Sequence, residues 1–281
     1  MDARYIQTIV SLALAEDLSG GDVTTNALVP KNHKSKARIV AKSAGTVCGL
    51  TLAKEAFKQL SSALRFQALV KEGQKVKPGA VIAQLNGSTR ALLSAERTAL
   101  NFLGYLSGIA TKTQAFVEAV KPYKTVILDT RKTTPLLRRL ERYAVRYGGG
   151  TNHRFNLADM AMLKDNHRAA VLRGQASLKH LVETIQHTKA VKIELEVDTL
   201  SQLKEALHSG ANVILLDNMT PSQVKQAVQL RNQAHSKVPL EASGGITLKN
   251  VRAYAAAGVE RISIGSLTHS RQALDVSLEF D

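Results

Sequence analysis

The feature that most constrains the fold is an alternation of short apolar runs and amphipathic stretches, which begins near residue 125. Repeated strand–helix units of this kind build a parallel sheet with right-handed crossovers. We predict a closed or incomplete α/β barrel of six or seven strands. An open doubly wound sheet is the alternative, but no Gly-x-Gly-x-x-Gly motif follows the first run. The predicted strands are 125–129, 160–164, 192–197, 212–217, 239–243 and 261–265, with helical stretches at 201–209 and 221–233.

The chain before residue 120 has a different pattern. Short β-branched runs punctuated by glycine lie at 37–41, 45–49 and 73–87, which is typical of a small antiparallel β domain. From 91 to about 120, leucines recur at helical spacing. This spacing predicts a long helix or a pair of helices between the two parts of the chain.

Charged or small polar residues stand at the carboxyl end of every predicted strand. In α/β barrels these ends form the face on which catalytic residues gather. One polar residue at a strand end is common, whereas six in succession are hard to explain by solubility alone. The strand ends are 129–132, 164–167, 196–198, 217–218, 243–245 and 265–266.

The charge of the chain indicates anionic partners. Lys and Arg number 38 against 23 Asp and Glu, a formal net charge of +15. Seven basic residues gather at 129–154 with two carboxylates and three successive glycines, a combination that suits carboxylate and phosphate groups. The eleven basic and two acidic residues of 31–80 are interpreted first as a solvated face. A nucleic-acid-binding protein is the rival of another class, but neither aromatic–basic interleaving nor zinc-ligand spacing supports it.

Two strand ends have the composition of phosphate-binding loops. Ser243-Gly244-Gly245 is expected to open a helix whose backbone N–H groups face an anion. Gly265-Ser266 offers a second set of donors, and the last two loops of such barrels commonly bind phosphate. Tight turns that need glycine are the alternative explanation.

Three carboxylates are candidates for a metal site. Glu194 and Glu196 lie two apart on one predicted strand, so both project to the same side, and Asp217 ends the next strand. Carboxylates on neighbouring strand ends can bind Mg²⁺ together with water and substrate oxygens. Salt bridges to Lys164 or Lys192 are an equally open explanation.

The remaining composition narrows the class of protein. The single cysteine, Cys48, lies in an apolar stretch and is interpreted as an inert buried thiol, which excludes an internal disulfide framework. No apolar run approaches the roughly 20 residues of a membrane helix. The apolar run at 9–15 lacks the flanking pattern of a signal peptide. We expect a cytoplasmic protein with no membrane partner.

Seven motifs of the chain together resemble those of one family: 129–135 (DTRKTTP), 148–154 (GGGTNHR), 163–167 (LKDNH), 262–270 (ISIGSLTHS), 15–18 (AEDL), 21–25 (GDVTT) and 95–101 (AERTALN). With these motifs the sequence resembles the quinolinate phosphoribosyltransferase (carboxylating nicotinate-nucleotide pyrophosphorylase) family. The similarity spans nearly the whole chain. Two positions depart from the family pattern: Leu136 stands where glycine is frequent, and Tyr147 where cysteine is frequent.

The resemblance implies a fold, a reaction and an assembly. The fold is an N-terminal α/β sandwich domain over 1–106 with an incomplete, seven-stranded α/β barrel over 107–270, and the tail at about 271–281 is a candidate to pack on the first domain. The reaction joins quinolinate to phosphoribosyl pyrophosphate and yields nicotinate mononucleotide, pyrophosphate and CO₂ in de novo NAD biosynthesis. The assembly is a homodimer or a higher homo-oligomer whose sites are completed across the interface.

The resemblance also implies roles for individual residues. Quinolinate is assigned to Arg131, His153, Arg154 and Lys164, with Arg97 from a partner subunit. Ribose, pyrophosphate and Mg²⁺ are assigned to Lys132, Glu196 and Asp217, which are also the candidate catalytic residues, and Glu196 and Asp217 are the candidate metal ligands. The phosphoribosyl group is assigned to Ser243, Gly244, Gly245, Gly265, Ser266 and His269.

Two alternative functions involve the same phosphoribosyl transfer but an acceptor other than quinolinate. They are a nicotinate-preferring phosphoribosyltransferase and a molybdenum-transport-associated paralogue. The groups at 152–154 and 164–167 favour an acceptor with two carboxylates.

Overall fold

The computed structural model describes residues 1–172, 177–188 and 191–281. The chain divides into two units. The first, the sandwich unit, comprises 1–114, 134–149 and 270–281, and the second, the barrel unit, comprises 115–133 and 150–269. The chain therefore passes between the units several times, which a division at residue 106 does not capture.

The sandwich unit contains a four-stranded antiparallel sheet in the order β12-β1-β5-β3. Side chains of β1 alternate, so that Lys36 and Arg38 are exposed while Ala37 and Ile39 are buried. Basic residues of this strand thus form a solvated face. The strands are β1 (Lys34–Ala41), β3 (Arg65–Ala68), β5 (Val81–Ser88) and β12 (Val276–Phe280), with a separate pair β2 (Gly45–Thr46) and β4 (Lys75–Val76).

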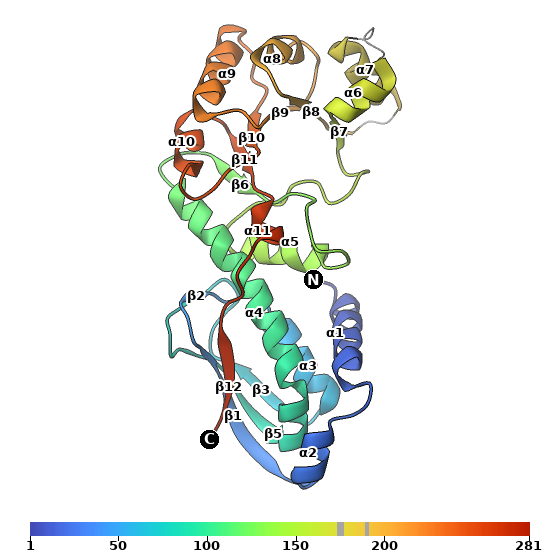
Figure 1. Ribbon diagram of the computed structural model, residues 1–281, viewed down its shortest axis with the longest axis vertical. Helices are drawn as coiled ribbons and strands as arrows, with labels where there is room; N and C mark the ends of the chain where they lie inside the picture. The colour runs from blue at the N-terminus through green and yellow to red at the C-terminus, as the bar shows by residue number, and fades with distance from the viewer. Residues whose placement is uncertain (173–176, 189–190) are drawn as a thin grey trace. The chain divides into compact units, whose positions relative to one another are not determined.

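Five helices start in this unit, and Figure 1 shows α1, α3 and α4 beside the sheet. Asp22 caps α2 by accepting from the backbone N–H of Thr25 and also accepts from the hydroxyl of Ser94, so the 21–25 motif serves the fold. Cys48 is buried, as predicted, and burial raises its pKa. The helices are α1 (Ala3–Leu18), α2 (Val23–Leu28), α3 (Leu50–Leu60), α4 (Thr89–Ala119) and α5 (Arg138–Tyr147).

The C-terminal tail lies in the sandwich unit. Strand β12 pairs with β1, and Ala37 stands opposite Phe280. Before the strand, the tail runs against α4 at two glycines. A Cβ at Gly108 would lie 2.1 Å from the carbonyl oxygen of Gln272, so only glycine permits this approach.

The barrel unit is built on a parallel sheet, and all six predicted strands are confirmed. Its order in the described residues is β6-β11-β10-β9-β8-β7. Thr151 forms an isolated parallel bridge with Leu128 of β6, at the place where a seventh strand would add. The strands are β6 (Val126–Leu128), β7 (Ala161–Leu163), β8 (Ile193–Val197), β9 (Val213–Asp217), β10 (Leu240–Ser243) and β11 (Arg261–Ser263).

The strands of the barrel unit are largely apolar because parallel strands are covered on both faces, and the glutamates of β8 and β10 are the main exceptions. Ile193, Leu195, Ile214 and Leu216 are completely buried. The fold class expected from the sequence, an α/β barrel with a separate antiparallel β unit, is confirmed. The helices of this unit are α6 (Asp165–Leu172), α7 (Leu178–Thr188), α8 (Leu200–Ala206), α9 (Pro221–Gln233), α10 (Val251–Ala256) and α11 (Ser266–His269).

Among the described residues, no helix combines the length and apolar character that crossing a membrane requires.

The backbone conformation at Leu136 explains why glycine is frequent at this position in the family. Its φ is +66°, in the left-handed region, and the residue is 88 % exposed. Glycine adopts this conformation without a steric penalty, whereas a residue with a Cβ does not. Leu136 therefore carries backbone strain that little apolar burial offsets.

We expect Leu136→Gly to raise the free energy of unfolding by up to about 1 kcal/mol, because relief of the strain exceeds the added flexibility of glycine. Denaturant unfolding measures the change. Leu136→Ala keeps the Cβ and serves as the control, with no comparable gain. A glycine variant less stable than the alanine variant contradicts the strain.

Candidate active site

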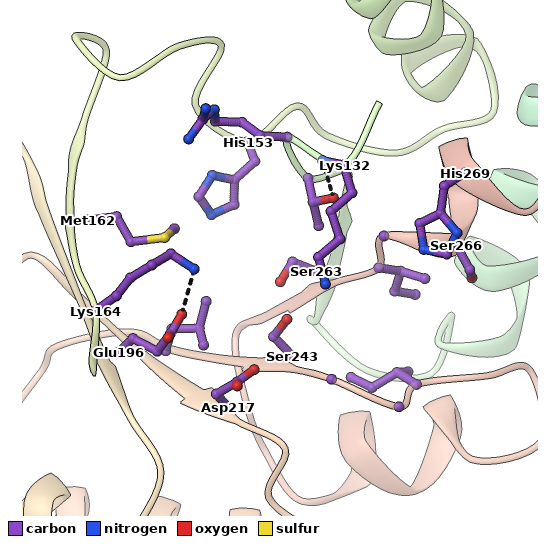
Figure 2. Close-up of a pocket in the computed structure, with 18 of the residues that line it drawn as sticks. Lys132, His153, Met162, Lys164, Glu196, Asp217, Ser243, Ser263, Ser266 and His269 are labelled. Atoms are coloured by element: carbon purple, nitrogen blue, oxygen red, sulfur yellow. Dashed lines mark hydrogen bonds and ion pairs between the residues drawn. The ribbon is translucent and has the colours of Figure 1, made fainter. Parts of the chain in front are cut away.

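A pocket of about 690 Å³ lies at the carboxyl ends of the barrel strands. Figure 2 shows His153, Lys164 and Glu196 along one side, Ser266 and His269 along the opposite side, and Lys132 between them. The pocket is lined by Thr130, Arg131, Lys132, His153, Arg154, Met162, Lys164, Glu196, Leu215, Asp217, Ser243, Gly244, Gly245, Ile246, Thr247, Ser263, Ile264, Gly265, Ser266 and His269. The structure thus brings together every candidate site residue except Arg97 and Glu194, one of the three carboxylates considered for a metal site.

Arg97 lies on α4 in the sandwich unit, and its side chain is exposed. It does not line the pocket. Its assignment to the site of a partner subunit stays a prediction.

The basic side of the pocket is organised by Asp129, to which sequence reasoning assigned no role. Asp129 is completely buried at the end of β6. Its carboxylate accepts from the backbone N–H of His153 at 2.6 Å and from Nδ2 of Asn152 at 2.7 Å. Since Arg131 follows Asp129 by two residues, this carboxylate holds both cationic segments at one mouth of the barrel.

Lys132 is fixed through its backbone. Its carbonyl oxygen accepts from Oγ1 of Thr268 at 2.6 Å, and the same hydroxyl lies 3.1 Å from the carbonyl oxygen of Gly265. Thr268 is completely buried and so joins the loop after β6 to the loop after β11. A Cβ at Gly265 would lie 3.2 Å from both the Lys132 side chain and Nε2 of His269, so glycine permits the close approach of these two loops.

The two glycine-containing loops differ from each other. Gly244 and Gly245 have φ of +90° and +62°, and a Cβ at Gly244 would lie 2.1 Å from Oδ1 of Asn218. The expectation that Ser243-Gly244-Gly245 opens a helix is wrong, because α10 begins only at Val251. The glycines instead turn the chain next to Asn218. By contrast, α11 does begin at Ser266.

Glu196 and Asp217 line the edge of the pocket, Glu196 beside Lys164 and Asp217 beside Ser243 (Figure 2). Nζ of Lys164 is 3.1 Å from Oε2 of Glu196, so one of the salt bridges considered from the sequence is present. Burial raises the pKa of Glu196, and the charge of Asp217 raises it further against the opposing effect of Lys164. Burial, followed by the charge of Asp198, also raises the pKa of Asp217. These pKa shifts mark carboxylates that a bound cation would stabilise.

A second pair of acidic residues lies beneath the pocket. Glu194 and Glu241 are completely buried, and their carboxylates are 3.1 and 3.2 Å from Nε2 of His153. Nε of Arg261 is 2.7 Å from the second oxygen of Glu241. Glu241 was missed because an acidic residue inside an apolar strand gives no sign of its partners in sequence.

The pKa values of this cluster follow from its contacts. Burial lowers the pKa of His153, but hydrogen bonds and charges from Glu194 and Glu241 outweigh it and raise the pKa to about 9. Burial raises the pKa of Glu194. Although burial opposes the shift, His153 and Arg261 hold the pKa of Glu241 below its usual value. The cluster therefore retains an additional proton at neutral pH. Because Nδ1 of His153 accepts the backbone N–H of Arg154, this proton is shared between Nε2 and the two carboxylates and is not on Nδ1.

We expect the free energy of unfolding to fall as the pH rises. The pKa of histidine is about 6.5 in the unfolded chain, whereas in the fold His153 and its two glutamates together hold the corresponding proton up to a pKa of about 9. The stabilisation is therefore complete below about 6.5 and lost as the pH rises through about 9. The loss is at most about 3 kcal/mol. Denaturant unfolding between pH 6 and pH 10 measures it. Glu194→Gln removes one of the two carboxylates beside the His153 ring and should reduce the dependence of stability on pH. Equal pH dependence in the two proteins contradicts the assignment of this proton to the His153 cluster.

Comparison with known proteins matches both parts of the chain to one family. The family description "Quinolinate phosphoribosyl transferase, N-terminal domain" matches residues 22–107, and the corresponding C-terminal domain matches 109–279.

Individual relatives agree. A probable nicotinate-nucleotide pyrophosphorylase [carboxylating] of Bacillus subtilis is 41 % identical over 99 % of this chain and 94 % of its own length. The nicotinate-nucleotide pyrophosphorylase [carboxylating] of Mycobacterium leprae is 40 % identical over 95 % of this chain and 94 % of its own. The solved structure of the Francisella tularensis nicotinate-nucleotide pyrophosphorylase is 34 % identical, with a TM-score of 0.92 over 100 % of this chain and 98 % of that one. With both domains matched and the site residues gathered in one pocket, this chain belongs to the quinolinate phosphoribosyl transferase family.

Proposed function

We propose that this protein transfers the phosphoribosyl group of phosphoribosyl pyrophosphate to quinolinate, with loss of one carboxylate as CO₂. The products are nicotinate mononucleotide and pyrophosphate, in de novo NAD biosynthesis. The observation that carries the proposal is one pocket with two kinds of lining: a cationic wall on one side, with Glu196 beside its Lys164, and two glycine-containing loops on the other, with Asp217 beside Ser243. Two multiply anionic substrates need such a pocket to meet.

The acceptor is assigned to the cationic wall. Arg131, Arg154 and Lys164 supply charges for two carboxylates, because guanidinium groups bind carboxylates in a bidentate way and ammonium groups act as point charges. His153 forms part of the same wall. We further propose that Arg97 of a partner subunit completes this side, so that the active form is a homodimer or a higher homo-oligomer.

The donor is assigned to the opposite side. Backbone N–H groups and hydroxyls of the two loops surround the phosphate, and Lys132 between the two sides reaches the pyrophosphate. The loop residues are Ser243, Gly244, Gly245, Gly265, Ser266 and His269. Glu196 and Asp217 face the ribose.

Mg²⁺ fits the same carboxylates. Glu196 and Asp217 have raised pKa values and lie at the pocket edge, so a hard divalent cation with oxygen ligands would relieve their repulsion. When bound there, Mg²⁺ supplies charge neutralisation for the pyrophosphate.

The reaction then proceeds by positioning and electrostatics. The bond between the ribose C1 and pyrophosphate breaks, and Lys132 stabilises the leaving oxygens. Glu196 and Asp217 face the positive charge that develops on the sugar, while the ring nitrogen of quinolinate forms the new bond. The alkylated nitrogen accepts electron density from the adjacent carbon–carboxylate bond, CO₂ leaves, and that carbon takes up a proton. No covalent intermediate with the enzyme is required.

The proposed location and partners of the protein are those of a metabolic enzyme that acts on small molecules. We propose that it works in the cytoplasm, without a membrane or nucleic-acid partner. The family membership and the carboxylates within the pocket weigh against nucleic acid, which would meet like charge there.

We expect Arg131→Ala or Lys132→Ala to lower catalytic efficiency about 30- to several-thousand-fold, equivalent to roughly 2–5 kcal/mol of lost interaction with a buried anion. The assay offers quinolinate or nicotinate with phosphoribosyl pyrophosphate and Mg²⁺ and follows CO₂ and mononucleotide. Lys225→Ala, on the exposed side of α9, is the control. Wild-type turnover of nicotinate with none of quinolinate rejects the proposed acceptor, and near-normal turnover in folded Arg131 and Lys132 variants rejects their roles.

Thr268 provides a test of the donor side. Thr268→Val keeps the shape of the side chain but removes the hydroxyl that holds the Lys132 carbonyl, so Lys132 is less well placed in the transition state. We expect catalytic efficiency to fall roughly 10-fold or more, as for one lost hydrogen bond of about 1.5 kcal/mol. Thr268→Ser retains the hydroxyl and should recover most of the activity. Equal activity in the valine and serine variants contradicts this role.

A further inference from the structure

His153 stands on the wall assigned to quinolinate, but both of its ring nitrogens are used by the protein. Nδ1 accepts the backbone N–H of Arg154 at 2.8 Å, so this nitrogen carries no proton in the observed arrangement. The proton of the ring is therefore on Nε2. The side chain is 5 % exposed, so a ligand in the pocket meets little of the ring.

Nε2 points into the barrel core. Its two neighbours, Glu194 on β8 and Glu241 on β10, approach within 3.1 and 3.2 Å, and neither residue lines the pocket. Arg261 holds the far oxygen of Glu241. Glutamates from two strands thus contact Nε2 of the ring. A substrate carboxylate could accept the Nε2–H only by displacing one of these buried glutamates.

Nδ1, the other ring nitrogen of His153, fixes the backbone position of Arg154. The bond from the Arg154 N–H to Nδ1 fixes the peptide from which this side chain leaves the chain. The guanidinium then donates through Nη1 to the carbonyl oxygen of Met160 at 2.9 Å and contacts Sδ of Met162 at 3.5 Å. An unbroken series of contacts therefore runs from Glu194 and Glu241 through His153 to Arg154.

We infer that Glu194, Glu241 and His153 are positioning residues that fix Arg154 for the carboxylates of the acceptor, and that His153 gives no N–H to the substrate. The inference rests on the proposed function, since it assumes that quinolinate binds against Arg154. It assigns a purpose to two buried carboxylates that no step of the reaction uses.

A double-mutant cycle tests the connection. Glu194→Gln removes one of the two negative charges that face Nε2 without touching the pocket. We expect it to raise the KM for quinolinate roughly 10- to 100-fold, the range for losing the charged partner of a hydrogen bond. The KM for phosphoribosyl pyrophosphate should not change. In an Arg154→Ala background the same substitution should add little, because its effect passes through Arg154. Equal effects of Glu194→Gln in both backgrounds overturn the inference.

The wild-type protein provides a second measurement that does not depend on a variant's folding. Nuclear magnetic resonance of ¹⁵N-labelled histidine reports which ring nitrogen carries a proton, and His153→Gln identifies the signal. On addition of quinolinate alone, without the second substrate, Nδ1 should stay unprotonated and Nε2 protonated. A proton gained at Nδ1 on binding overturns the inference. Failure of the wild-type protein to bind or convert quinolinate instead rejects the proposed function.

Discussion

The pocket depends on one buried carboxylate. Asp129 ends β6, is completely buried, and accepts from the backbone of His153 and the side chain of Asn152. A buried carboxylate is costly unless hydrogen bonds satisfy it, so the arrangement that satisfies Asp129 is strongly preferred over others. This arrangement brings the loop after β6 and the segment before β7 to one mouth of the barrel. These two segments carry Arg131 and Arg154 of the cationic wall, and Lys164 follows β7.

Charge balance explains why so many ionic groups lie near one pocket. The cations that face the pocket repel one another in the absence of substrate, and charges in a partly dry site interact more strongly than in water. Glu196 at the edge and Glu194 and Glu241 beneath counter part of this charge. The excess of +15 in the whole chain therefore has two components. One is concentrated in the pocket, whereas basic side chains such as Lys36 and Arg38 lie on a solvated sheet face.

The sequence predicted the barrel strands because parallel strands buried on both faces leave near-continuous apolar runs with polar ends. It also predicted which polar residues at the strand ends lie together in one pocket, because the ends of parallel strands share one edge of the sheet. Three features of the site could not be predicted from the sequence. The start of α10 depends on how Gly244 packs against Asn218, the bond from Thr268 joins residues 136 apart, and the buried state of Glu241 depends on Arg261 and His153. Each is a tertiary contact of a single polar group, which no periodicity records. Leu136 is an intermediate case, since its departure from the family pattern marked the position where φ is positive.

The most direct test of this arrangement is a crystal structure of the protein with quinolinate bound. The two carboxylates are expected within hydrogen-bond distance of Arg131, Arg154 and Lys164, with the ring nitrogen directed toward the side of the pocket that contains Asp217 and Ser243. His153 should keep its contacts to Glu194 and Glu241. Quinolinate bound outside this pocket, or held by a nitrogen of His153 turned away from the glutamates, would contradict the assignment of the site.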